Sequence, residues 1–317
     1  MQTYLPYPDF QQSAAALDTT RLGKQRVEAL QTLRALVIPE YGRQSHPVIR
    51  MWMGYVPALT MYALAMADEW IARGNPDNTR ESIKEFAPQA AHPDYADKIP
   101  MPPWLGDPDF HLSQRSKLLQ KDPQFYGEAF AGTPTDLEFL WPEPHHEFVP
   151  QDPQDDFVWV LRAPVGDVDP EKIDKVGMPA PGKAKPAAAE ASGTASSSTA
   201  SSSTEADSYE FVYAEEKSRR PVAKGARKAP KKLVKKPTRN RQRQDEAFRT
   251  LPGNTTVLIP IDGGARFALG KVQGRPITLD DGRFGRNFKV TDVVDRSAFD
   301  YPALLQDPRV FFPVPAL

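Results

Sequence analysis

The sequence DTTRLGKQRVEALQTLRAL, residues 18–36, is the clearest indication of how this chain folds. Successive residues of a helix turn by about 100°, and this spacing predicts one amphipathic helix over the stretch. The apolar side chains that share one side of it are Leu22, Ala29, Leu33 and Leu36. The polar side chains that gather on another side are Arg21, Lys24, Gln25 and Glu28.

The carboxylate of Glu28 stands among cations in this helix, and two interpretations stay open. It is a catalytic acid held ionised close to an anionic substrate, or it forms an ordinary surface ion pair with Lys24, four residues earlier. Arg26 falls inside the apolar sector. A guanidinium in that position has to reach a cleft or meet an acid.

The chain as a whole is predicted to be mainly α, in three parts. Residues 1–150 read as a compact all-helical domain, in which the last helix starts at Ser113 and ends before Pro123. Residues 151–250 read as a linker with low-complexity and basic segments, apart from short strands at 156–161 and 209–213. Residues 251–317 read as a small β module with strands at 255–261, 265–272, 277–279 and 288–294.

The charge of the chain is divided unevenly. Residues 217–243 contain 13 of the 40 Lys and Arg residues and no acid, so 27 basic residues stand against 41 acidic ones elsewhere. Such a run predicts a polyanionic partner, most simply nucleic acid. Its self-repulsion and prolines predict disorder until it binds.

Several classes of function are excluded or disfavoured. The chain has no cysteine, which excludes disulfides, thiolate metal sites and a cysteine nucleophile, and its five histidines are scattered. There is no phosphate-binding loop, dinucleotide fingerprint or nucleophile elbow. We therefore expect no cofactor and no metal. No signal peptide or membrane span is evident, so we expect a soluble monomer in the cytoplasm, associated with the nucleoid, or in the nucleus of a eukaryote.

Three blocks resemble the pyrimidine-dimer DNA glycosylases, the phage endonuclease V family. The first is Arg21-Leu-Gly-Lys-Gln-Arg-Val-Glu-Ala-Leu30. The second runs from His46-Pro47 through an apolar helix to Arg73-Gly74, and the third runs from Ser113-Gln114 to Phe125-Tyr-Gly127. Together they span about residues 1–130.

The resemblance implies a single all-α domain that binds duplex DNA containing a lesion and displaces a nucleotide from the stack. A primary amine at the N-terminus would attack C1′ of the damaged nucleotide, expel the base and leave an imine that can β-eliminate. An α-amine suits this role because its ordinary pKa of about 8 lies well below that of lysine. The family's glutamate falls on Glu28, the acid/base.

The same resemblance assigns the other site residues. Gln2 predicts that the initiator methionine is retained, so Met1 is the candidate nucleophile, and Val27 stands where the family has arginine. The residues expected to bind DNA phosphates are Arg21, Lys24 and Arg26, with Lys117 and Lys121 as further candidates on the last helix.

Two rival functions remain open. Residues 1–150 carry 13 basic and 19 acidic residues, so we expect the 217–243 run to supply affinity for DNA. The alternatives are a non-catalytic nucleic-acid-binding protein that keeps the glycosylase fold, and a protein-interaction scaffold whose basic run is a localisation signal.

Overall fold

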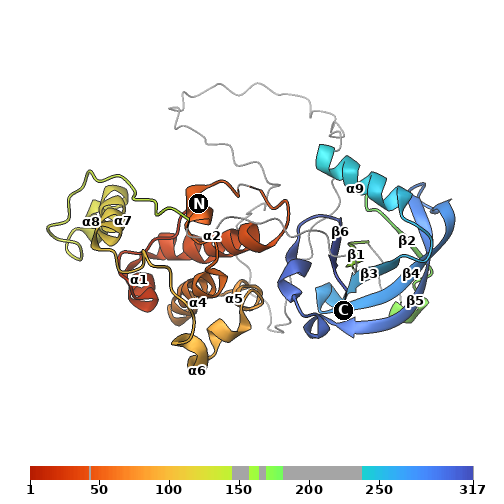
Figure 1. The fold of residues 1–317 in the computed structure, drawn as a ribbon, viewed down its shortest axis with the longest axis horizontal. Helices are drawn as coiled ribbons and strands as arrows, with labels where there is room; N and C mark the ends of the chain where they lie inside the picture. The colour runs from red at the N-terminus through yellow and green to blue at the C-terminus, as the bar shows by residue number, and fades with distance from the viewer. Residues whose placement is uncertain (43, 145–156, 164–168, 181–237, 317) are drawn as a thin grey trace, which may run out of the picture.

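The computed structural model describes the chain except residues 43, 145–156, 164–168, 181–237 and 317. It contains a helical unit and a sheet unit (Figure 1). The predicted strand at 209–213 and the basic residues 217–237 lie outside the described residues. No helix in the described part of the chain is both long and apolar enough to cross a membrane.

The helical unit is built around α2 and α4, which pack against each other. Its helices are α1 (Phe10–Ala16), α2 (Thr19–Val37), α3 (Pro47–Arg50), α4 (Val56–Ala72), α5 (Arg80–Lys84), α6 (Pro93–Ala96), α7 (Pro108–Lys121) and α8 (Pro123–Tyr126). The predicted apolar stripe of α2 faces the core, where Leu22, Ala29 and Leu33 are fully buried. Helix α7 begins five residues before the predicted start, because Asp107 caps it and Pro108 occupies its first turn.

The sheet unit corrects the prediction of a mainly α protein. It contains one six-stranded mixed sheet with the order β2-β5-β4-β3-β1-β6. The strands are β1 (Phe157–Leu161), β2 (Lys175–Gly177), β3 (Thr256–Ile261), β4 (Arg266–Thr278), β5 (Phe284–Asp295) and β6 (Phe311–Pro315). Two of these strands, β1 and β2, come from the range that we expected to be linker.

Strand β1 lies inside this sheet, parallel to β3 and antiparallel to β6. Both of its faces are covered, which explains its continuous apolar sequence. Val158 and Val160 pack on one face, and Leu161 packs on the other with Phe248 of α9 (Arg239–Thr250). The partner strand is almost a hundred residues away in the sequence, and local pattern carries no information about such a pairing.

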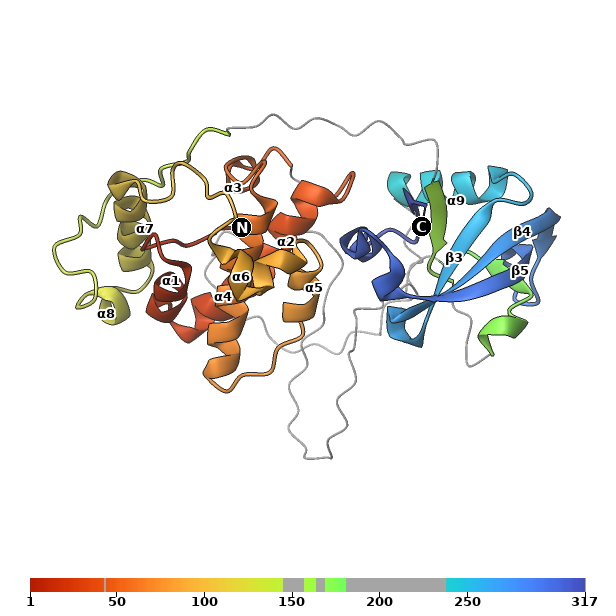
Figure 2. The ribbon, with the colours of Figure 1, turned by 60° about the horizontal axis from the view of Figure 1, so that its bottom comes forward.

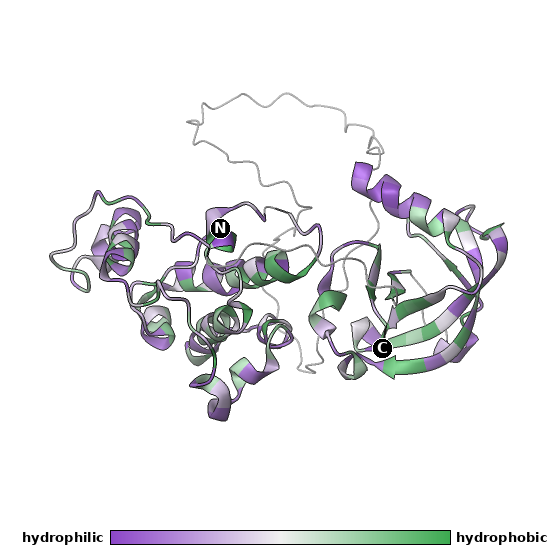
Figure 3. Ribbon diagram, viewed as in Figure 1, coloured by the Kyte–Doolittle hydropathy of each residue, from purple (hydrophilic) through white to green (hydrophobic). Residues whose placement is uncertain are grey.

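The prediction of disorder for the basic run is wrong for residues 239–243, because these residues form the first five positions of α9. Thr238 caps the helix by accepting a hydrogen bond from the Arg241 amide at 3.3 Å. Phe248 is buried in the sheet unit, while the first half of the helix is strongly hydrophilic (Figure 3). The cationic residues of this end are thus ordered on the surface.

Asp18 fixes the start of α2. Its carboxylate accepts hydrogen bonds from the Arg21 amide at 3.0 Å and the Tyr126 hydroxyl at 2.5 Å, and it pairs with the Arg21 guanidinium. Burial acts to raise the pKa of Asp18, but these hydrogen bonds and the Arg21 charge outweigh it, so the pKa lies below its ordinary value. The ionised carboxylate therefore stabilises the fold.

We expect Asp18→Asn to lower the free energy of unfolding at pH 7 by about 1–2 kcal/mol. Because the pKa of Asp18 is lower in the folded state, its ionised carboxylate contributes stability above the unfolded-state pKa, which is near 4. That contribution is lost as the pH falls through the folded-state pKa. The variant should therefore lose less stability than the parent protein below about pH 4. Denaturant unfolding at several pH values checks this. Asp136→Asn, which changes an exposed carboxylate, is the control and should behave like the parent.

Candidate active site

The first seven residues are tied into the core of the helical unit. Thr3 and Leu5 are 2% and 0% exposed. Four side chains from three other parts of the unit hold this segment. Trp52 Nε1 donates to Thr3 Oγ1 at 3.1 Å, and Gln25 Oε1 accepts from the Tyr4 amide at 2.8 Å. From α7, Arg115 Nη1 donates to the Pro6 carbonyl at 2.8 Å and His111 Nδ1 lies 2.7 Å from the Leu5 carbonyl. Residues 3–6 are consequently held in one place.

Glu28 receives this segment. Its Oε2 accepts hydrogen bonds from the Gln2 amide at 2.9 Å and from Gln25 Nε2 at 3.2 Å. The Met1 side chain packs against α2, the helix that carries Glu28, and its sulfur lies 3.4 Å from Thr32 Oγ1. An ion pair between Glu28 and Lys24 is not among those that the described residues form. One of the two interpretations of Glu28, the surface ion pair with Lys24, is therefore not found among the described residues.

Gln25 was expected on the polar side of the helix, but it is 1% exposed and forms a buried junction. Its Oε1 lies 2.6 Å from the Tyr62 hydroxyl and accepts from the Tyr4 amide, while its amide nitrogen donates to Glu28. Burial raises the pKa of Tyr62 well above its ordinary value, and the charge of Glu28 raises it further. Tyr62 therefore stays a hydroxyl donor. The spacing of Gln25 three residues before Glu28 was the signal for this contact.

A cavity of about 310 Å³ opens beside Met1 and Glu28. This volume lies at the lower end of the range of about 300–1,000 Å³ for ligand sites. Residues of both units line it, and they are Met1, Glu28, Gln31, Pro39, Glu40, Tyr41, Gly42, Asn240, Asp307, Pro308 and Arg309. Sequence reasoning missed the last four, since it treated the two units as tethered and separate.

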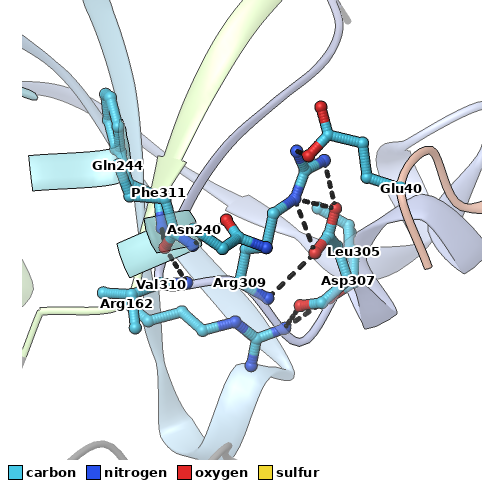
Figure 4. Close-up of polar contacts among 9 residues, drawn as sticks. All are labelled: Glu40, Arg162, Asn240, Gln244, Leu305, Asp307, Arg309, Val310 and Phe311. Carbon is cyan, nitrogen blue, oxygen red and sulfur yellow. Dashed lines mark hydrogen bonds and ion pairs between the residues drawn. The ribbon is translucent and has the colours of Figure 1, made fainter. Parts of the chain in front are cut away.

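The two units meet through the connection between β5 and β6, residues 296–310. Arg296 makes two bonds to the Glu85 carboxylate, at 2.5 and 2.9 Å. Gln306 accepts from Arg34 Nε at 3.0 Å and donates to the Ser82 carbonyl at 2.8 Å. These contacts place the segment that leads to β6 against α2 and α5 (Figures 1 and 2). They also bring the next residues, Asp307 and Arg309, to the cavity that they line (Figure 4).

Two of the predicted phosphate-binding arginines already have carboxylate partners. Arg21 pairs with Asp18, and it lies over the Tyr126 ring. Arg26 escapes from the apolar sector to Asp77, at 2.5 Å, and stacks over Trp70. Asp77 is 2% exposed in its side chain, so this is a buried pair that stabilises the fold. No sequence signal joins residues 51 positions apart.

The predicted lysines differ from one another. Lys24 is exposed and lies one helical turn before Glu28, with no ion pair among the described residues. Lys117 pairs with Glu138 at 3.0 Å, whereas Lys121 is exposed at the end of α7. Neither lysine of α7 lines the cavity. Lys24 is therefore the predicted cation that the structure leaves available near Glu28.

The candidate site of the helical unit is thus a carboxylate, Glu28, that accepts from the Gln2 amide beside a cavity that Met1 also lines. The described residues contain no cluster of three or more His, Asp or Glu side chains that could hold a metal ion. Residues 1–82 match the model of the pyrimidine dimer DNA glycosylase family. No curated protein and no solved structure matches the chain.

The family match confirms the resemblance over the first two sequence blocks, which include Glu28. It supports a DNA-repair glycosylase at the level of the family. The third block, at residues 113–127, lies outside the matched stretch, and its assignment stays a prediction.

We expect Arg26→Gln to lower the free energy of unfolding by about 2–3 kcal/mol, because it leaves the buried Asp77 carboxylate without its cation. Lys24→Gln, two residues earlier on the same helix, should change it by less than about 0.5 kcal/mol. Urea unfolding of both variants measures the difference. Equal stability of the two would contradict the assignment of Arg26 to the fold.

Proposed function

We propose that this chain is a DNA-repair glycosylase with AP-lyase activity, which excises damaged pyrimidines, with pyrimidine dimers as the candidate lesion. The α-amine of Met1 is the nucleophile and Glu28 is the acid/base. The observation that carries the proposal is the 2.9 Å hydrogen bond from the Gln2 amide to Glu28, at a cavity that Met1 and Glu28 both line. The family match over this segment supports it.

In this mechanism the neutral amine attacks C1′ of the damaged nucleotide. A bond forms between the amine nitrogen and C1′, and the bond from C1′ to the base breaks, with its electron pair leaving on the pyrimidine. The carboxylate of Glu28 stabilises the cationic sugar and takes the proton that the amine loses. The lone pair of the nitrogen then forms the C=N bond of the imine while the bond between C1′ and the ring oxygen breaks, and protonated Glu28 returns its proton to that oxygen. The Glu28 carboxylate next removes a C2′ proton, and the electron pair of that C–H bond expels the 3′ phosphate.

The geometry suits such chemistry because it holds the segment that carries the nucleophile, through the bond from the Gln2 amide to Glu28. A reacting group held at a set position removes much of the entropy cost of an encounter. The Gln2 amide and the buried Gln25 orient the Glu28 carboxylate toward the N-terminus. A nucleotide extruded from the duplex would occupy the cavity.

Cations on both units would hold the duplex around the cavity. Lys24 lies one turn from Glu28 on α2, and Arg239 and Arg243 are exposed on α9, where Asn240 lines the cavity. None of the three forms an ion pair within the described ranges. We infer that they bind DNA phosphates, together with the basic run that precedes α9.

Covalent trapping tests the proposed chemistry. With borohydride, we expect the parent protein to form an adduct on a duplex carrying a cyclobutane thymine dimer and on an abasic duplex, but none on undamaged DNA. Glu28→Gln should reduce adduct formation on the dimer duplex by about 100-fold or more. Glu128→Gln, at an exposed carboxylate without an ion pair among the described residues, is the matched control and should match the parent.

The absence of an adduct on every duplex, with DNA binding intact, would instead favour the non-catalytic nucleic-acid-binding protein. The absence of DNA binding at low salt would favour the interaction scaffold.

Salt dependence tests the phosphate contacts. The slope of log K against log[salt] for duplex binding should become shallower by about 1.8 in the double variant Arg239→Gln/Arg243→Gln, since each phosphate contact contributes about 0.9. Arg275→Gln changes an exposed arginine away from the cavity, in β4, and should leave the slope unchanged. An unchanged slope in the double variant would contradict the assignment of α9.

A further inference from the structure

We propose that the sheet unit carries a second DNA-binding surface, separate from the candidate active site, which holds the phosphate backbone of a duplex. It is the uncovered part of one face of the sheet. We call it the lysine face, and its residues are Lys175, Thr256, Lys271, Gln273, Asn287 and Lys289. The identity of the polyanion rests on the proposed function, whereas the surface itself goes beyond it.

The strand register brings the six residues together in two rows. In the first row Lys289 of β5 lies opposite Lys271 of β4, which lies opposite Thr256 of β3. The second row joins β2, β5 and β4 through Lys175, Asn287 and Gln273. Residues opposite each other, and residues two apart along a strand, project from the same face of a sheet. The two rows therefore form one continuous patch.

The same face of the sheet is apolar and covered at its other end. There the β5–β6 connection packs on the sheet through Phe299 and Leu305, in a cluster with Leu258 and Phe267. Along β4 the residues of this face change from Phe267 and Leu269 to Lys271 and Gln273, and the last two are exposed. The change of residue type coincides with the end of the cover.

The opposite face behind the lysine face is closed. Val272 and Phe288, the neighbours of the lysines along β4 and β5, are buried in one cluster with Phe248 of α9. The sheet thus has a complete core on that side. The lysine face is consequently not the exposed side of an unfinished core, and its polar residues need another explanation.

The cations of this patch have no carboxylate partner. Lys175, Lys271 and Lys289 are exposed, and none of them forms an ion pair among the residues that the structure describes. The acid nearest in register is Asp292, which lies opposite Leu269. Like charges directly opposite each other destabilise a sheet, so the pairing of Lys271 with Lys289 costs stability in the free protein. A bound anion would relieve that repulsion.

The chemistry of the patch fits a duplex backbone. Lysine, asparagine, glutamine and threonine are among the side chains that contact phosphates. The lysine face contains no aromatic residue, so it offers no platform on which an unstacked base of a single strand could lie. The four strands from β2 to β3 span about 14 Å. A duplex carries one charge per about 1.7 Å of its axis, so several phosphates pass over this width.

The lysine face is distinct from the candidate active site. None of its six residues lines the cavity beside Glu28. Helix α9, which carries Arg239 and Arg243, packs on the opposite face of the sheet through Phe248. Strands β4 and β5 also extend away from the helical unit (Figures 1 and 2). The chain would thus contact DNA at two surfaces, and the second raises the local concentration of DNA at the first.

Salt dependence and chemical protection test the lysine face in the full chain. For an undamaged duplex, the slope of log K against log[salt] should become shallower by about 1.8 in Lys271→Gln/Lys289→Gln, since each phosphate contact contributes about 0.9. Lys84→Gln/Lys98→Gln, which changes two exposed lysines of the helical unit, is the matched control and should keep the parent slope. In the parent, duplex DNA should protect Lys271 and Lys289 from acetylation, as measured by mass spectrometry.

Arg275, the control for the α9 variants, lies in the irregular stretch between Gln273 and Ile277 and is outside the two rows. The Lys271→Gln/Lys289→Gln variant should unfold at the parent's temperature or slightly above it, because it removes a repulsion. An unchanged slope, or an equal change in the control, would overturn the proposal. Protection by single-stranded DNA and not by duplex would overturn the assignment to a duplex.

Borohydride trapping separates this surface from the proposed chemistry. With protein in excess over an abasic duplex, Lys271→Gln/Lys289→Gln should form the adduct at the parent rate. A tenfold slower adduct in this variant would place the two lysines in the active site and overturn a separate surface. If the parent traps no abasic duplex, the proposed function fails, while the slope and the protection still decide whether the lysine face binds DNA.

Discussion

The structure depends on the burial of the N-terminal segment. Residues 3–5 lie in the helical core, and Gln25 joins the Tyr4 backbone, Tyr62 and Glu28 in one buried network. A buried polar group is costly unless it is bonded, so these contacts fix where the chain begins relative to α2. The position of the N-terminus is consequently a property of the core, and the chemistry proposed for Met1 relies on it.

The second constraint is the docking of the sheet unit on α2 and α5. Arg296 and Gln306 bond to groups of the helical unit, and the chain that follows them forms one wall of the cavity beside Glu28. Arg239 and Arg243 of α9 flank Asn240, which also lines this cavity. We propose that the acidic helical unit and the basic residues of α9 are complementary parts of one site. The helical unit supplies the reacting groups, and α9 supplies cations for the DNA phosphates.

The local features of this chain were readable from its sequence, and the distant pairings were not. The 3.6-residue period predicted α2 and its buried stripe, and Glu28 stood out as an acid among cations. The partner of Arg26 depends on tertiary packing, so its role was not visible. Strand β1 was predicted, but its membership in a six-stranded sheet was missed because its partner strands lie beyond residues 181–237. The helix pattern places Arg21 on the polar side and Arg26 in the apolar sector, and only their carboxylate partners, Asp18 and Asp77, show that both serve the fold.

The site of the covalent bond can be located directly. The borohydride-trapped adduct on the thymine-dimer duplex is digested with protease and nuclease, and the modified peptide is sequenced by mass spectrometry. We expect the sugar remnant to be attached to the α-amine of Met1, in the peptide that contains Gln2 and Thr3. Attachment to a lysine side chain, with Lys24 as the nearest candidate on α2, would contradict the central claim that the buried N-terminal segment positions the nucleophile.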